Sequence, residues 1–199
     1  MIKNIIFDIG NVLTVFCWEK YFKSFGYSDE MVERIARAST KNQAWNEYDR
    51  GVLSAEEVLN LFISQDPGIE AELRKVNENL SGILERCDYA IPWIEELHAK
   101  GFRVYYLSNF FEKAERECSE ALDFIPYTDG GILSYKEQLI KPDSAIYKLL
   151  MERYQLVAEE CVFIDDRADN CEAARRLGMQ AVCFQTRGQA VKELNKMGV

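Results

Sequence analysis

The sequence has no apolar run of membrane-spanning length, no CxxC pair and no excess of positive charge. The first absence excludes a transmembrane helix. Acidic residues outnumber basic ones by 33 to 24, so the chain gains nothing from neutralising phosphate backbones and we expect no nucleic-acid partner. Six cysteines without paired spacing indicate no zinc site. With no signal-peptide pattern before the first strand-like run, we expect a cytoplasmic protein with reduced thiols.

The composition is that of a globular protein. Hydrophobic residues make up 48% of the chain and charged residues 29%, which allows a sizeable core. The 199 residues suffice for one ordinary domain with a small insertion.

Short apolar runs that end in turn residues organise the chain. Residues 5–7 are apolar and lead into Asp8, and residues 161–164 lead into Asp165 in the same way. Such runs are typical of buried strands in parallel sheets. Similar runs at 102–107 and 180–184 alternate with helical patterns at 110–122, 141–154 and 168–177. This alternation predicts an α/β fold, a three-layer Rossmann-like parallel sheet.

The segment 15–87 has a different character. It shows helical periodicity and no strand pattern, with a capping-box sequence from Ser54 to Glu57 and one more helix expected over 69–84. We therefore predict a helical cap over residues 15–87, inserted after the first strand. The core then consists of residues 1–14 and 88–199.

Five residues at the ends of these elements suggest a common chemistry. In open α/β sheets, ligands bind beyond the carboxyl ends of the strands, where we expect Asp8 and Asp165. The carboxylates of Asp8, Asp165 and Asp166 would repel one another without a cation, and hard oxygen ligands suit Mg²⁺. The Ser108 hydroxyl, with the helix after it, could bind phosphate, and Lys141 could supply a positive charge. This set predicts phosphoryl transfer to Asp8, followed by hydrolysis of the aspartyl phosphate.

Each motif alone also has a plainer interpretation. Asp165-Asp166 could mark a helix N-terminus, Ser108-Asn109 could be a helix cap, and a lysine before proline is most often a solvated surface residue. Their occurrence together, each at the junction of two elements, favours an active site.

The same segments carry a resemblance to a known family. The first motif reads FDIGNVL, the second LSN, the third is the lysine of SYKEQLIKP, and the fourth reads FIDDRADN. Over its full length the chain resembles hydrolases of the haloacid dehalogenase superfamily. The wording of the first and fourth motifs is similar to the bacterial α-D-glucose-1-phosphate phosphatase-like branch.

This resemblance implies a role for each motif residue. Asp8 would be the nucleophile and a metal ligand. The backbone carbonyl of Gly10 and the carboxylate of Asp166 would bind Mg²⁺, with Asp165 binding directly or through water. The phosphate would be held by Ser108, Asn109 and Lys141.

Gly10 departs from the family pattern. Phosphatases of the superfamily usually carry an aspartate there, which acts as general acid and base. Without it, we expect a preference for leaving groups of low basicity, such as those of sugar 1-phosphates or acyl phosphates, unless a cap acid such as Glu47 or Asp49 takes the role. Glu47, Asp49 and Arg50 are also candidates for substrate contact, and their plainer interpretation is a solvated helix end.

The sequence thus predicts Mg²⁺-dependent hydrolysis of a small phosphomonoester, with a small phosphorylated metabolite as the partner molecule. Two alternatives remain open. One is a dehalogenase that works without metal. The other is a weakly active phosphate-binding or regulatory protein that has lost the acid.

Overall fold

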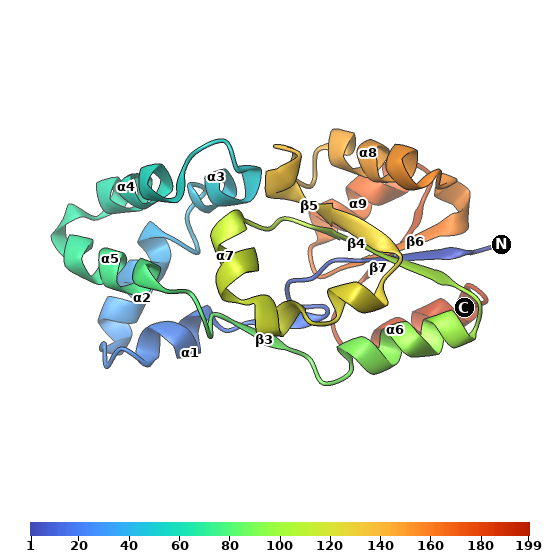
Figure 1. Cartoon of the computed structure of the whole chain (residues 1–199), viewed down its shortest axis with the longest axis horizontal. Coiled ribbons are helices and arrows are strands. Elements are labelled where there is room, and N and C mark those ends of the chain that lie inside the picture. Colours follow the sequence, from blue (N-terminus) through green and yellow to red (C-terminus); the bar gives the residue numbers. More distant parts are fainter.

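A five-stranded parallel sheet forms the centre of the protein in the computed structural model, which describes residues 1–199 (Figure 1). The strand order is β5-β4-β1-β6-β7, so β1 lies in the middle. Phe7, the last residue of β1, pairs with Tyr106 of β4 and with Ile164 of β6. The strands are β1 (Asn4–Phe7), β4 (Arg103–Ser108), β5 (Gly130–Leu133), β6 (Cys161–Asp165) and β7 (Gln180–Cys183).

Helices cover both faces of this sheet. Successive residues of a strand point to opposite faces, and β1 shows this clearly. Ile5 and Phe7 belong to the apolar cluster that contains residues of α6 (Ala90–Ala99) and α10 (Arg187–Lys196). Ile6 belongs to the other cluster, with residues of α8 (Ser144–Tyr154) and α9 (Ala168–Arg176). The predicted three-layer Rossmann-like fold is therefore confirmed. None of the helices combines the length and the apolar character that a membrane-spanning segment needs.

A second group of helices lies beyond the carboxyl end of the sheet, at the left of Figure 1. We refer to it as the helical unit: α1 (Trp18–Lys23), α2 (Asp29–Ala38), α3 (Trp45–Arg50), α4 (Ala55–Gln65) and α5 (Glu70–Glu78). The capping box at the start of α4 is present, since Ser54 Oγ accepts from the Glu57 N–H and Glu57 accepts from the Ser54 N–H. The division into a cap over 15–87 and a core over 1–14 and 88–199 stays a prediction.

The expectation of no strand between residues 15 and 87 is wrong. Two strands, β2 (Thr14–Phe16) and β3 (Leu84–Arg86), form an antiparallel ladder where the chain enters and leaves the helical unit. Each has three residues, too few to show an alternating pattern. The helix predicted over 69–84 ends at Glu78, because the side chain of Asn79 accepts from the Ser81 N–H and Gly82 adopts a φ of +94°.

The helix predicted over 110–122 is also shorter than expected. It is divided into α7 (Glu112–Glu117) and a 3₁₀ turn (Ser119–Leu122). The Phe110 N–H donates to Ser134 Oγ at 2.9 Å, and Phe111 is extended, so the segment cannot enter a helix before Glu112.

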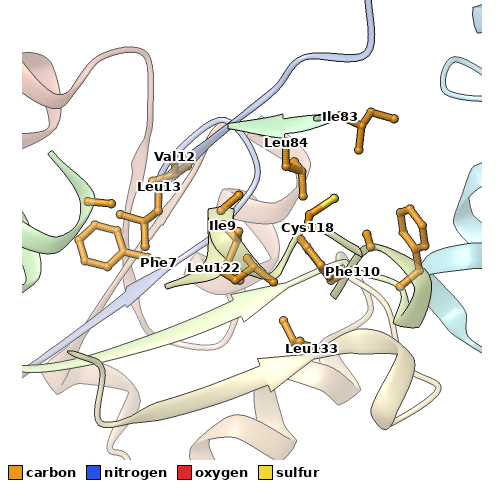
Figure 2. Packing of buried hydrophobic residues seen from close by; sticks show 14 of the residues in the cluster. Phe7, Ile9, Val12, Leu13, Ile83, Leu84, Phe110, Cys118, Leu122 and Leu133 are labelled. Carbon is orange, nitrogen blue, oxygen red and sulfur yellow. The ribbon is translucent and has the colours of Figure 1, made fainter. Parts of the chain in front are cut away.

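A buried apolar cluster supports the loop that follows β1. Ile9, Val12 and Leu13 are fully buried. Figure 2 shows them in the same cluster as Leu84 of β3 and Leu122. Dense packing leaves such a loop little freedom to move, so the direction of Asp8 is fixed by apolar contacts on both sides of it.

Candidate active site

Asp8, Lys141 and Asp165 form one buried group of charges. β1 and β6 are parallel neighbours, so Asp8 and Asp165 emerge side by side. Lys141 Nζ lies 2.9 Å from Asp8 Oδ1 and 2.6 Å from Asp165 Oδ2, and the lysine side chain is only 1% exposed. The interpretation of Lys141 as a solvated surface residue is therefore wrong.

Asn109 holds the backbone of Lys141. Its Nδ2 donates to the Lys141 carbonyl at 3.0 Å, and the Lys141 N–H donates to its Oδ1 at 2.7 Å. Both ends of the amide are thus engaged with the protein, so this side chain positions the lysine. The neighbouring Ser108 is 1% exposed at the end of β4. A hydrogen bond from its hydroxyl to the Asp8 carboxylate acts to lower the pKa of Asp8, against the effect of burial.

The two adjacent aspartates differ in their surroundings. Asp165 is fully buried and accepts from Lys141, from the Arg167 N–H at 2.8 Å and from Asn170 Nδ2, which lies 3.0 Å from each of its oxygens. Asp166 faces the cavity and accepts one side-chain hydrogen bond, from Asn11 Nδ2 at 3.0 Å. Asp166 therefore has oxygen lone pairs to offer a ligand, and those of Asp165 are largely taken.

Asn11 connects the first and fourth motifs. It has a φ of +56°, a conformation that asparagine tolerates better than most residues. While its Nδ2 binds Asp166, its Oδ1 accepts from the Phe16 N–H at 3.1 Å. The sequence marks Asn11 only as a turn residue after a strand, and neither partner could be read from it.

The carboxylates fit a divalent cation. Oxygens of Asp8, Asp165 and Asp166 lie within 4.8 Å of one another. Burial raises the pKa of Asp8, and the charge of Lys141 opposes this shift. Burial also raises the pKa of Asp166, where the hydrogen bond from Asn11 opposes it. Three carboxylates beside one ammonium group leave two negative charges uncompensated. A hard cation of charge +2 matches both this charge and the all-oxygen donor set.

A cavity of about 580 Å³ lies between the carboxyl end of the sheet and the helical unit. Its sheet side contains Asp8, Gly10, Asn109, Lys141 and Asp166, and Ser108 and Asp165 are buried behind it. Its other side comes from the helical unit. The sequence indicated α3 as a possible contributor and named Asp49, but it gave no sign of residues 40–43, because the connection between α2 and α3 shows no periodicity or motif. The lining residues there are Thr40, Lys41, Asn42, Gln43, Trp45, Asn46 and Asp49.

The three candidate residues on α3 do not share one environment. Glu47 and Arg50 are half-exposed, lie outside the cavity lining and pair with each other at 3.7 Å. Asp49 lines the cavity and is 7% exposed. Burial raises the pKa of Asp49 to about 7, and the negative charge of Asp8 adds to this shift.

Comparison with known proteins identifies the family. The sequence profile of the haloacid dehalogenase-like hydrolases matches residues 2–178. The chain belongs to this family. It is 26% identical over 221 residues to a phosphatase of Mycobacterium tuberculosis, which covers 99% of this chain and 95% of the relative. It is also 26% identical over 203 residues to a drimenol cyclase of Aspergillus calidoustus, but there it spans only 37% of the relative's length.

A solved structure supports the fold of this haloacid dehalogenase-like hydrolase. An enzyme of the same family from Bacteroides thetaiotaomicron, in complex with magnesium and inorganic phosphate, superimposes with a TM-score of 0.70. The match covers 94% of this chain and 96% of the other, at 21% sequence identity. The predicted family and the prediction of an enzyme are confirmed.

Proposed function

We propose that this hydrolase is a Mg²⁺-dependent phosphatase that cleaves a small phosphomonoester through an aspartyl phosphate on Asp8. The observation that carries the proposal is the buried Asp8–Lys141–Asp165 group beside Asp166, with Asp8, Lys141 and Asp166 open to the cavity. A relative named as a phosphatase and a neighbour crystallised with magnesium and phosphate support it.

In this proposal the core residues divide the work. Mg²⁺ would be held by Asp8, Asp166 and the Gly10 carbonyl, and when bound it neutralises phosphate oxygens. Asp165 fixes Lys141, whose ammonium group stabilises the charge of the transferring phosphoryl group. Asp8 Oδ1 already accepts from the Ile9 N–H and from Lys141, so we assign the attack on phosphorus to Oδ2.

The cavity lining favours a sugar phosphate as the partner metabolite. The amides of Gln43 and Asn46 can donate to and accept from ring hydroxyls. Trp45 and Phe16 offer aromatic surface for the apolar face of a ring. A sugar 1-phosphate, as the resemblance to the glucose-1-phosphate phosphatase-like branch implies, is the first substrate to test.

Removal of the metal tests this function. Chelation with EDTA should lower phosphate release from a panel of phosphomonoesters by about a hundredfold or more, and added Mg²⁺ should restore it, because the uncompensated carboxylates repel the substrate phosphate. Asp166→Ala should raise the Mg²⁺ concentration for half-maximal activity by about tenfold or more.

Asp169→Ala is the matched control for this experiment. Asp169 lies on α9, three residues from Asp166, and is not among the residues that line the cavity. Its side chain pairs at 2.9 Å with Arg167, which does line the cavity. Asp169→Ala should leave the Mg²⁺ requirement unchanged. Full phosphate release after chelation would contradict the metal requirement. Halide release from a 2-haloacid, with no phosphate release from any ester, would instead support a metal-independent dehalogenase. Tight phosphate binding without turnover would support a binding protein.

A further inference from the structure

We propose that Asp49, from the helical unit, supplies the general acid and base that Gly10 cannot supply. The inference rests on the proposed phosphatase function and names a further catalytic residue for it. It follows from where the Asp49 carboxyl lies, from how its helix is anchored, and from the absence of another partner for it.

The position of Asp49 places it opposite the nucleophile. It lines the same cavity as Asp8, Gly10 and Lys141 although it comes from a different part of the fold. In addition to burial, the charge of Asp8 raises the pKa of the Asp49 carboxyl, and the charges of Lys141 and Arg167 lower it. Its neighbour Glu47, two residues earlier on the same helix, faces away and pairs with Arg50.

Helix α3 is held against the sheet domain at several points around Asp49. The Ser134 hydroxyl donates to the Asp49 carbonyl, and Ser134 Oγ in turn accepts from the Phe110 N–H. The Tyr48 ring stacks on Phe111 with centroids 4.6 Å apart. At the end of the helix, Gly51 approaches Tyr135 so closely that a Cβ would lie 2.7 Å from it. These contacts fix the position of helix α3 and of the Asp49 backbone relative to the sheet.

The Asp49 carboxyl has no hydrogen-bond or ion-pair partner within the protein. A buried acid that serves only the fold is normally paired, because an unpaired buried charge is costly. Burial instead raises the pKa of Asp49 to about 7, so the carboxyl can hold a proton near neutral pH. A protonated acid aimed into a cavity is what a departing alkoxide requires.

The proposed steps balance as follows. An oxygen of Asp8 forms a bond to phosphorus, the bond from phosphorus to the ester oxygen breaks, and the Asp49 proton moves to that oxygen, which leaves as the alcohol. Water then attacks phosphorus and gives a proton to the Asp49 carboxylate. The bond from Asp8 to phosphorus breaks, so that inorganic phosphate leaves and both aspartates return to their starting states.

Esters graded by the basicity of the leaving group test the role. With the Mg²⁺-loaded enzyme, kcat/KM reports the steps up to the first cleavage and should change little between p-nitrophenyl phosphate and alkyl phosphates. In Asp49→Asn we expect kcat/KM to fall about a hundredfold to ten-thousandfold for alkyl phosphates. For p-nitrophenyl phosphate, whose leaving group needs little protonation, the loss should stay below about tenfold.

Two further variants sharpen the result. Glu47→Gln removes a carboxylate from the same helix outside the cavity and should leave the kcat/KM values unchanged. Gly10→Asp in the Asp49→Asn background should recover much of the loss on alkyl phosphates. The site can take this side chain, because a Cβ at Gly10 would meet nothing within 4 Å.

The outcomes separate this proposal from the proposed function. The role of Asp49 is overturned if Asp49→Asn lowers kcat/KM by the same factor for all esters. It is also overturned if kcat/KM of the parent already falls steeply with the basicity of the leaving group and the variant keeps that slope. In both cases the phosphatase function stands. If the parent releases phosphate from no ester, the function itself fails. Should Asp49→Asn fold poorly by circular dichroism, Asp49→Glu keeps the acid and must keep the weak dependence on the leaving group.

Discussion

Replacing Asp8 with asparagine is expected to lower phosphate release at least about ten-thousandfold, as losses of a catalytic nucleophile do. The carboxamide has nearly the shape of the carboxylate but cannot form the acyl phosphate. Lys141 keeps its second partner, Asp165, so no buried charge is left alone. The measurement is steady-state turnover on the best substrate of the panel, alongside far-UV circular dichroism.

The control for this variant is Asp88→Asn, which makes the same chemical change at an exposed position. It should behave like the parent in both measurements. A natively folded Asp8→Asn protein with near-normal turnover would refute an aspartyl phosphate on this residue.

Replacing Lys141 with methionine is expected to abolish activity and to lower the free energy of unfolding by about 3–5 kcal/mol. The lysine is 1% exposed and is the ammonium group that contacts both Asp8 and Asp165. Without it, two buried carboxylates face each other with no opposite charge. Urea denaturation in the presence of EDTA measures the loss, because a bound cation would otherwise compensate for the missing charge.

Lys136→Met is the matched control. Lys136 is half-exposed and pairs with Glu115 at 2.8 Å, and such surface pairs contribute at most about 1 kcal/mol. If Lys141→Met unfolds at the same urea concentration as the parent protein, the buried charge group is not a stabilising element.

The sequence predicted the centre of the fold better than its margins. The strands β1, β4 and β6 have uninterrupted apolar runs, because helices bury both of their faces. β2 and β3 have three residues each, and they form only because they pair with each other although they lie far apart in the chain. The start of α7 depends on a hydrogen bond from Phe110 to Ser134, and no local pattern contains that bond.

The candidate site shows the same division. Asp8, Lys141 and Asp166 could be predicted because each follows or precedes an element at one edge of the sheet. The connection between α2 and α3 could not, since it reaches the cavity only through the packing of the helical unit. Glu47 and Asp49 are both acidic and lie two residues apart on α3, so their facing directions differ by roughly 200° at 100° per residue. Only the docking of the helix decides which of them meets the cavity.

The anchoring of α3 by Ser134, Tyr135 and Phe111 has a consequence for laboratory evolution. The helix forms part of the substrate wall and also carries the carboxyl that we assign to proton transfer, and both are fixed by the same contacts. Mutant libraries in α3 should therefore change selectivity and speed together. Residues 40–43 line the cavity from a loop, so libraries there should change substrate selectivity without changing the rate of the chemical step.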